Sequence, residues 1–457
     1  MAVFKQGDIL SVKIEDQGTN GEGIAKEQGF VIFVEGALID ERVKIKIDFV
    51  KKDFAYAHIV EILNASPHRV YPECNRYPKC GGCDLLHMAY HEQLEFKRRL
   101  VANTLKKYAG KDFFVNPCVP SKDSLYYRNK VQLPFGVVNG KAAVGFFRKG
   151  SHKIVSMTKC FLHGSWLQKL IEIVLDFVNA HNISVYDEQK HAGLLRHLVA
   201  RYVCDQLCVT LVINGDKLPY AHKLAQKLLD SFSAISFYLC VNTQKTNVIM
   251  TDKLKPVIDR PLEIEAMGVK AKIGPLSFLQ VNDAVRDEIY KEVMQKACGS
   301  DIVFDIYGGI GLLGAALAKR GVKKVYNIEI VRQAVKDADK LAAENMLSDR
   351  ITNICGDAAV ELPKVMGKAL KDKKDAKISV IVDPPRKGLN TAVIDTLVKL
   401  DMPLNLIYIS CNPATLARDL ALLTQNGDYD IISITPYDMF PQTRHVECVV
   451  LMSRVEK

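Results

Sequence analysis

The chain has 457 residues, a length that fits about three domains of ~100 to 200 residues each. Hydrophobic residues make up 48% and charged residues 25%, ordinary values for a globular protein, which excludes a disordered or fibrous chain. No apolar run reaches the ~20 residues that span a bilayer, and the first residues lack the apolar stretch of a signal peptide. We therefore expect a cytoplasmic protein without a membrane partner.

The net charge of +10 is concentrated in one segment of the sequence. Residues 1–66 hold 8 Lys+Arg against 11 Asp+Glu, which gives −3, whereas residues 67–160 hold 17 against 6, which gives +11. Aromatic residues are interleaved with this charge, as in Tyr126-Tyr127-Arg128. Because cations neutralise phosphates and rings stack on unpaired bases, the segment fits an RNA-binding face. From charge alone, a solvated basic surface is an equally good interpretation.

Short strand patterns alternate with turn residues over the first 65 positions. Strands are predicted at 9–14, 29–34, 43–47 and 56–62, and the densest turn signal covers residues 18–23. Regularly spaced short strands are typical of a small barrel, a common RNA-binding accessory. A helix is predicted after them, from Tyr90 to Tyr108, and its polar positions hold Lys97, Arg98, Arg99, Lys106 and Lys107.

Four cysteines have the pattern of a metal site. Cys74, Cys80 and Cys83 lie within ten residues of one another, and Cys160 follows downstream. A reducing cytosol disfavours structural disulfides, so clustered thiols there indicate metal binding or catalysis. Four thiolates suit an iron–sulfur centre or a structural zinc ion, and spacing alone does not choose between them. The remaining interpretation is that they are unrelated small buried residues.

From residue 301 onward, apolar strand patterns alternate with helical patterns, which predicts a parallel, doubly wound sheet. The strand at 302–307 leads into a glycine-rich turn at 308–311 and an apolar helix at 312–320, and Glu329 ends the next strand. This arrangement indicates a nucleotide-binding turn, with Glu329 as a partner for ribose hydroxyls. The glycines at 309, 311 and 314 also match the fingerprint of NAD-dependent dehydrogenases, and a structural turn without a ligand uses glycine in the same way.

Three reactive side chains follow or precede other predicted strands. Asp383 follows the strand at 378–382, Cys411 follows the strand at 406–410, and Glu447 precedes the strand at 448–452. A thiol before a helix N-terminus near Thr415 is predicted to have a lowered pKa and to act as a nucleophile. Glu447 is a candidate general base. Alternatively, Cys411 fills a small buried space and Glu447 is an exposed residue that begins a strand.

The combination of these motifs resembles the RNA uracil-5-methyltransferases that carry an N-terminal barrel and an iron–sulfur cluster, the family of the 23S rRNA 5-methyluridine enzymes. The resemblance rests on residues 16–25 and 33–37, the four cysteines, and the motifs at 277–282, 410–413 and 440–447. It implies a class I S-adenosylmethionine-dependent methyltransferase with an α/β, Rossmann-like sheet. The implied domains are a TRAM-like RNA-binding barrel at 1–65, a central iron–sulfur and RNA-binding domain at 66–265, and a catalytic domain at 266–457.

The same resemblance implies the site residues. Cys411 is the nucleophile that adds to carbon 6 of uracil, Glu447 is the base, and Asp383 orients the reacting groups. One family position with a polar cofactor contact is occupied here by Leu312. The implied S-adenosylmethionine site consists of Gln280, Tyr307, Gly309, Glu329 and Asp383. The implied ligands of a [4Fe-4S] cluster are Cys74, Cys80, Cys83 and Cys160.

We expect a monomer that methylates 23S rRNA, with tRNA as the alternative substrate. Amino-group methylation of adenine is a rival reaction that uses a similar proline-rich turn but needs no thiol nucleophile. A dehydrogenase and a non-enzymatic RNA-binding assembly protein are the other interpretations, and the intact reacting residues argue against both.

Overall fold

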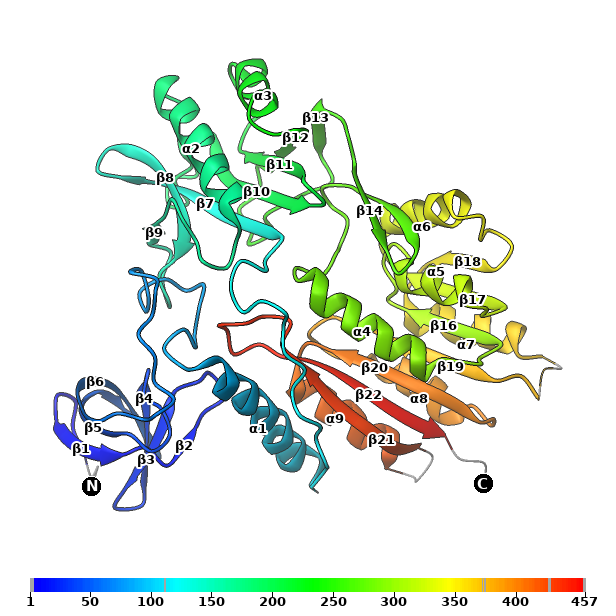
Figure 1. Ribbon diagram of the computed structural model, residues 1–457, viewed down its shortest axis with the longest axis horizontal. Coiled ribbons are helices and arrows are strands. Elements are labelled where there is room, and N and C mark those ends of the chain that lie inside the picture. The colour runs from blue at the N-terminus through cyan, green and yellow to red at the C-terminus, as the bar shows by residue number, and fades with distance from the viewer. Residues whose placement is uncertain (1–3, 111, 372, 374, 426–428, 455–457) are drawn as a thin grey trace.

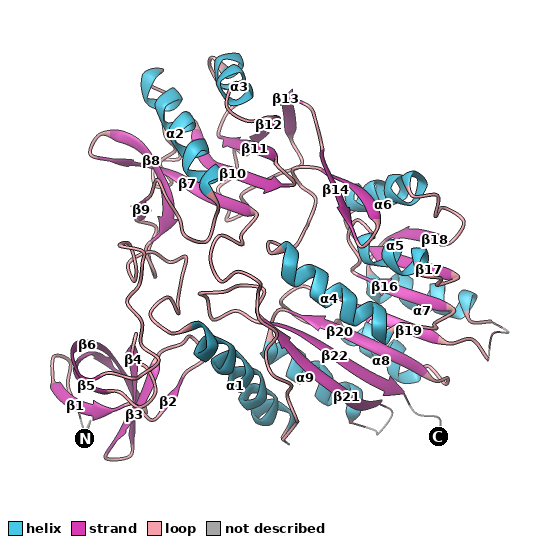
Figure 2. Cartoon of the chain, viewed as in Figure 1, coloured by secondary structure: helices cyan, strands magenta, loops and turns pink. Residues whose placement is uncertain are grey.

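The computed structural model describes residues 4–110, 112–371, 373, 375–425 and 429–454. Figure 1 shows a small barrel near the N-terminus, a central sheet with two helices, and a large sheet covered by helices in the C-terminal half. Helix α1 (Tyr90–Ala109) lies between the barrel and the large sheet, and long loops connect these parts (Figure 2). Among the described residues, no helix combines the length and the apolar character needed to cross a membrane.

The N-terminal barrel is a six-stranded sheet in the order β1-β5-β6-β4-β3-β2. Alternate residues point inward, so Val43, Ile45 and Ile47 of β5 are buried in the barrel core. The four predicted strands are present. The sequence missed β2 and β3 because β2 is only two residues long and β3 begins inside the glycine-rich turn signal. The strands are β1 (Ile9–Lys13), β2 (Asp16–Gln17), β3 (Gly23–Glu27), β4 (Phe30–Glu35), β5 (Arg42–Val50) and β6 (Phe54–Asn64).

The central part is a seven-stranded mixed sheet in the order β13-β12-β11-β10-β7-β8-β9. Helices α2 (Ser165–Ala180) and α3 (Ala221–Leu229) pack on it through apolar side chains such as Leu170, Val174 and Leu224. The strands are β7 (Lys130–Val138), β8 (Lys141–Phe147), β9 (Ile154–Ser156), β10 (Leu195–Val203), β11 (Gln206–Ile213), β12 (Ala234–Val241) and β13 (Leu254–Ile258).

The C-terminal sheet has seven strands in the order β18-β17-β16-β19-β20-β22-β21. The predicted parallel arrangement is confirmed for β16 to β20, but β22 runs antiparallel to both β20 and β21. No helix connects β21 to β22, so the chain returns in the opposite direction. The strands are β16 (Ile302–Ile306), β17 (Lys324–Glu329), β18 (Ile351–Cys355), β19 (Ile378–Val382), β20 (Leu404–Ser410), β21 (Tyr429–Tyr437) and β22 (Glu447–Arg454).

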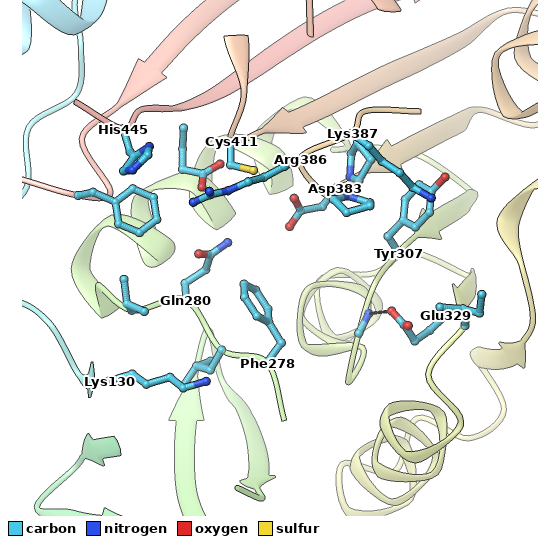
Figure 3. Close-up of a pocket in the computed structure, with 18 of the residues that line it drawn as sticks. Lys130, Phe278, Gln280, Tyr307, Glu329, Asp383, Arg386, Lys387, Cys411 and His445 are labelled. Carbon is cyan, nitrogen blue, oxygen red and sulfur yellow. Dashed lines mark hydrogen bonds between the residues drawn. The ribbon is translucent and has the colours of Figure 1, made fainter. Parts of the chain in front are cut away.

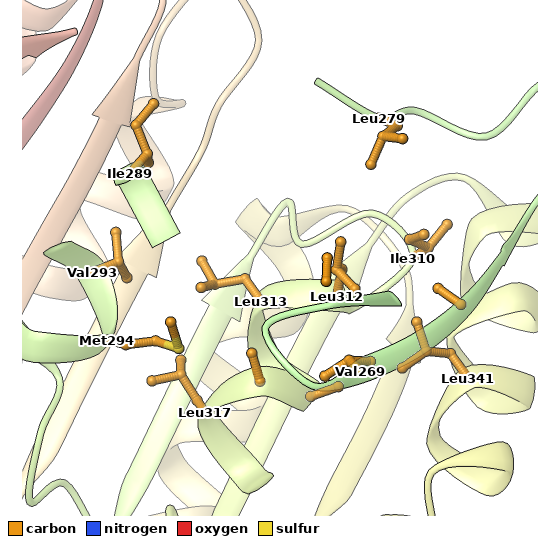
Figure 4. Packing of buried hydrophobic residues seen from close by; sticks show 14 of the residues in the cluster. Val269, Leu279, Ile289, Val293, Met294, Ile310, Leu312, Leu313, Leu317 and Leu341 are labelled. Carbon is orange, nitrogen blue, oxygen red and sulfur yellow. The ribbon is translucent and has the colours of Figure 1, made fainter. Parts of the chain in front are cut away.

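Helices cover both faces of this sheet, as expected for a doubly wound α/β fold (Figure 1). One face carries an apolar core built from α4 (Asp283–Lys296), α5 (Leu312–Lys319) and the hairpin of β14 (Leu262–Ala266) and β15 (Val269–Ile273). Figure 4 shows this core around Leu312, Leu313 and Leu317. The helices are α4 (Asp283–Lys296), α5 (Leu312–Lys319), α6 (Arg332–Glu344), α7 (Ala358–Ala369), α8 (Thr391–Lys399) and α9 (Pro413–Thr424).

The hairpin of β14 (Leu262–Ala266) and β15 (Val269–Ile273) lies at the expected boundary between the central and catalytic domains. The boundary expected between residues 265 and 266 falls inside β14. Leu262 and Ile264 belong to the same apolar core as α4 and α5. We therefore propose that the catalytic unit begins with β14, and the three-domain division itself stays a prediction.

Helix α1 is fixed to the catalytic sheet by a buried ion pair. Val101 and Leu105 belong to the core of that sheet. The Lys97 side chain is fully buried, forms an ion pair with Asp438, and donates a second hydrogen bond to the Phe440 carbonyl at 3.0 Å. The prediction that Lys97 lies on a polar surface is therefore wrong. Its partner is 341 positions away in the sequence, beyond the reach of any local pattern.

The Lys97 ion pair leads to a stability prediction. A Lys97→Met variant keeps the length of the side chain but leaves the buried Asp438 carboxylate unpaired. We expect the free energy of unfolding, measured by urea denaturation, to fall by ~3 to 5 kcal/mol. Lys106→Met is the matched control, because Lys106 and its partner Asp112 are both exposed, and a loss below ~0.5 kcal/mol is expected. Equal losses in the two variants would contradict this role.

Candidate active site

One cavity of about 870 Å³ brings together all the residues expected for catalysis and cofactor binding. It lies at the carboxyl ends of β16, β17, β19 and β20, the side where doubly wound sheets bind their ligands. Figure 3 shows Cys411, Asp383 and Gln280 on one side of this space and Tyr307 and Glu329 on the other. The expected residues among those that line it are Gln280, Tyr307, Gly309, Glu329, Asp383, Cys411 and Glu447.

The Tyr307–Glu329 side has the geometry of a nucleotide-binding turn. Tyr307 and Gly309 both adopt positive φ angles, of 66° and 59°, a conformation that is uncommon for a residue with a side chain and that often occurs at functional sites. The Gly309 amide donates a hydrogen bond to Glu329 Oε2 at 3.2 Å, and the Val331 amide donates to Oε1 at 2.8 Å. The Glu329 carboxylate is thus held at the edge of the cavity. Leu312, which stands at a position where the sequence resemblance implies a polar cofactor contact, is buried in the apolar core.

The thiol of Cys411 is positioned by the turn between β20 and α9. Asn412 caps α9, because its side-chain oxygen accepts a hydrogen bond from the Ala414 amide at 3.1 Å. The Asn412 side-chain amide donates to the Arg386 carbonyl at 3.0 Å, and the Thr415 hydroxyl donates to the same carbonyl at 3.2 Å. These bonds tie the Cys411 turn to the proline-rich turn that carries Asp383.

The pKa of the Cys411 thiol is raised to about 11, so the predicted lowering is wrong. Burial is the largest cause, followed by the nearby carboxyl groups of Glu447 and Asp383, while Arg386 acts in the opposite direction. Sequence reasoning considered only the helix N-terminus after the thiol. The helix does begin there, but desolvation and two acidic neighbours have the larger effect on the thiolate.

Two carboxyl groups beside Cys411 also have raised pKa values. Burial raises the pKa of Glu447 well above its usual range, and the charge of Asp383 is the second largest cause. Burial and the neighbouring Asp305 raise the pKa of Asp383 to about 7. Glu447 is 3% exposed, and its Oε2 atom has no hydrogen-bond partner in the described part of the chain. A carboxylate in such surroundings is more basic than an exposed one, which suits a general base.

Several residues of the cavity were not singled out by the sequence analysis. Arg386, in the turn after Asp383, supplies a positive charge next to Cys411 and Glu447. Asp357 caps α7 and lines the cavity near Glu329, and Phe278 contributes an exposed ring. Asp357 could have been found from its position just after β18, but the sequence analysis did not predict that strand.

A second cavity, of about 550 Å³, reaches Cys411 from the direction of the barrel. It shares Arg386, Cys411 and His445 with the first cavity. Its outer walls are strand β2 of the barrel with the two residues after it, at 16–19, and the face of α1 that carries Arg99 and Lys107. Cys411 is thus accessible both from the Tyr307–Glu329 side and from a groove with basic side chains.

The four clustered cysteines line one pocket. Burial raises the pKa of Cys160 to about 11 and that of Cys83 further, and the other thiols add to both shifts. In the described part of the chain, however, no three His, Cys, Asp or Glu side chains are arranged to hold a metal ion. The shared pocket fits a four-thiolate group by donor type and number. The thiols would have to converge to bind one.

Two family models match the sequence, and their ranges agree with the parts of the fold. The model described as "TRAM domain" matches residues 3–60, which contain most of the barrel, and the model described as "tRNA (Uracil-5-)-methyltransferase" matches residues 89–455. With the α/β sheet described above, they define an S-adenosylmethionine-dependent class I methyltransferase with an N-terminal TRAM domain. The chain belongs to the RNA uracil-5-methyltransferase family.

Known proteins resemble the chain over nearly its whole length. An RNA methyltransferase of Clostridium tetani, described as uncharacterized, is 37% identical and is matched over 98% of this chain and 97% of its own. One from Staphylococcus epidermidis is also 37% identical, with full coverage of both chains. The crystal structure of Pyrococcus abyssi tRNA (uracil-54, C5)-methyltransferase in complex with S-adenosyl-L-homocysteine superposes with a TM-score of 0.76 at 27% identity, covering 97% of this chain and 100% of that one.

The raised thiol pKa leads to a prediction about alkylation. Because only the thiolate reacts, the rate of Cys411 alkylation by iodoacetamide should rise about tenfold per pH unit from pH 7 towards pH 10. Asp383→Asn should increase the rate at pH 9, where Asp383 is ionised and opposes thiolate formation. Asp357→Asn is the matched control and should leave the rate unchanged, and peptide mass spectrometry reports the labelled residue. A rate independent of pH would contradict the raised pKa.

Proposed function

We propose that this enzyme methylates carbon 5 of a uridine in 23S rRNA through a covalent adduct between Cys411 and carbon 6 of the base. The observation that carries the proposal is the placement of a thiol, a buried carboxyl group and the expected cofactor residues around one cavity. Methylation of an amino group of adenine, the rival reaction, has no use for a thiol nucleophile beside a buried carboxyl group.

The proposed reaction begins at Cys411 because carbon 5 of uracil is a weak nucleophile. The Cys411 thiolate adds to carbon 6, and the electron pair of the 5,6 double bond moves into an enolate. Carbon 5 of the enolate then takes the methyl group that S-adenosylmethionine supplies. Glu447 removes the remaining proton from carbon 5, the 5,6 double bond re-forms, and the thiolate of Cys411 leaves. All bonds made to the enzyme are thereby broken again.

Other residues of the cavity are proposed to position the reactants. Gln280, Tyr307, Gly309 and Glu329 hold the cofactor, and Asp383 orients the uracil edge or the nucleophile. The central part of the chain helps to position the backbone of Gln280, because the Asn129 side chain donates a hydrogen bond to the Gln280 backbone carbonyl at 3.0 Å. A base inside an RNA helix cannot reach a covalent pocket, so the target uridine must be unstacked.

Two substrates are compatible with this mechanism. We propose 23S rRNA because the barrel and the four-cysteine pocket occur together, as in the rRNA enzymes that the sequence resembles. The second candidate is tRNA, which is the substrate named for the Pyrococcus abyssi enzyme. One chain carries every residue proposed here, so we also propose a monomer.

We further propose that Cys74, Cys80, Cys83 and Cys160 hold a [4Fe-4S] cluster. Their thiols line one pocket, and the glycines at 81 and 82 leave room for a tight turn of the backbone between the second and third. The reaction above needs no electron, so the proposed role is structural: the cluster holds the loop at residues 74–83 against the central sheet and next to the RNA.

The cluster proposal predicts the metal content of the protein. Anaerobically prepared protein should contain iron and acid-labile sulfide and absorb visible light, and Cys80→Ser should lose most of both. Cys355→Ser is the matched control, because this exposed cysteine lies outside the pocket and its replacement should leave the iron content unchanged. Stoichiometric zinc without iron in the unsubstituted protein would contradict the proposal.

The adduct mechanism predicts that variants of Cys411 and Glu447 stop the reaction at different steps. Cys411→Ala should abolish 5-methyluridine formation while S-adenosylmethionine still binds in calorimetric titration. Glu447→Gln should accumulate a protein–RNA adduct that survives denaturing electrophoresis, because elimination requires removal of the carbon 5 proton. The control is Cys298→Ala, which replaces an exposed thiol outside the cavity. Methyl transfer retained by Cys411→Ala would overturn the mechanism.

A further inference from the structure

A third cavity, of about 820 Å³, lies between the barrel and the loop that carries the clustered cysteines. Aromatic side chains contribute to its walls from both sides, with Tyr56 on the barrel and Tyr71, Tyr77 and His87 on the loop. The Tyr71 side chain is 95% exposed, so its ring is available to a ligand. None of these residues takes part in the reaction proposed above.

His87 lines this cavity and carries a buried ring nitrogen, Nε2, without a hydrogen-bond partner among the described residues. It is 3% exposed, and burial lowers its pKa to about 4, so the ring is neutral. The Tyr77 hydroxyl donates to the Asp84 carbonyl at 2.9 Å, so its oxygen accepts the hydrogen of His87 Nδ1. Nε2 is therefore the unprotonated nitrogen, and no residue that the structure describes donates a hydrogen bond to it. A ligand that satisfies it must donate a hydrogen bond.

The cations of the cavity are largely neutralised by carboxylates within it or next to it. Arg69 binds the buried Glu41 carboxylate at 2.5 Å. Lys149 and Arg444 each lie 3.4 Å from Asp84. A lining of rings with paired charges suits a neutral, flat, hydrogen-bonding ligand better than a bare phosphate. A nucleobase has these properties.

The third cavity is connected by shared residues to the reactive thiol. Arg444 lines both the third and the second cavity, and the second cavity shares Arg386, Cys411 and His445 with the active site. The shared residues make each space a neighbour of the next, from the barrel to the carboxyl ends of the catalytic strands. A single RNA strand that places a uridine at Cys411 can continue along the basic groove into the third cavity.

We propose that the third cavity binds the base of a second unpaired nucleotide in the same RNA strand, stacked on Tyr71 and donating an N–H group to His87 Nε2. This inference rests on the proposed function, because it requires RNA in the groove beside Cys411. It adds a second contact point, away from the target base, that helps the enzyme select its RNA.

A scan with abasic nucleotides tests this binding site. The probe is a fluorescent single-stranded RNA of about 15 nucleotides with one uridine among adenosines, and each variant replaces one flanking base with an abasic ribose. With the anaerobically prepared enzyme, one or two neighbouring flanking positions should weaken binding by about fivefold or more. That loss should disappear in Tyr71→Ala, which already lacks the stacking ring. Tyr220→Ala, which removes an exposed tyrosine outside the three cavities, should keep it.

A second arm tests the hydrogen bond to His87. Replacing the adenosine at the sensitive position with purine riboside removes the amino group and keeps the ring, and binding should weaken in the unsubstituted enzyme but not in His87→Leu. If His87→Leu does not fold, the Tyr71 comparison still decides. The inference is overturned if no flanking position depends on Tyr71. Formation of 5-methyluridine on full-length transcripts, measured with the same preparations, reports separately whether the proposed function itself fails.

Discussion

The arrangement of the active site depends on the docking of the segment between β21 and β22 against α1 and the cysteine-rich loop. The buried Lys97 side chain pairs with Asp438 at the start of this segment. Gln442, near its middle, exchanges two hydrogen bonds with the Gln93 side chain at 2.9 and 3.0 Å. The backbone carbonyl of Gln442 also accepts hydrogen bonds from the backbone amides of Asp84 and Leu85, both at 3.0 Å. These contacts fix the segment that leads to Glu447, so parts of the chain far apart in sequence together determine where the Glu447 carboxyl group lies.

Burial is the common cause of the unusual electrostatics of the site. Cys411, Asp383 and Glu447 are three acidic groups with raised pKa values in a space of low polarity, and the charge of Arg386 opposes the shifts of Cys411 and Glu447. Burial thus disfavours the charged form of all three groups. It lowers the thiolate fraction of Cys411, and it makes each carboxylate a stronger base than an exposed one.

Three residues of the cavity could be placed together from the sequence because each follows a parallel strand of the same sheet. The carboxyl ends of parallel strands meet at one edge of a sheet, so Tyr307, Asp383 and Cys411 had to be neighbours once the strands were recognised. The rest depended on contacts between distant segments. The burial of Lys97, the antiparallel direction of β22 and the raised pKa of Cys411 follow from tertiary packing, which no local pattern contains.

The central claim is that this chain forms 5-methyluridine in RNA. The most direct measurement incubates the purified protein and labelled S-adenosylmethionine with separate 23S rRNA and tRNA transcripts, and maps the methylated nucleotide by nuclease digestion and mass spectrometry. The account predicts label at carbon 5 of uridine in the rRNA transcript. Label confined to tRNA would keep the mechanism and replace the substrate. No 5-methyluridine in either RNA, with the cofactor shown to bind, would contradict the account.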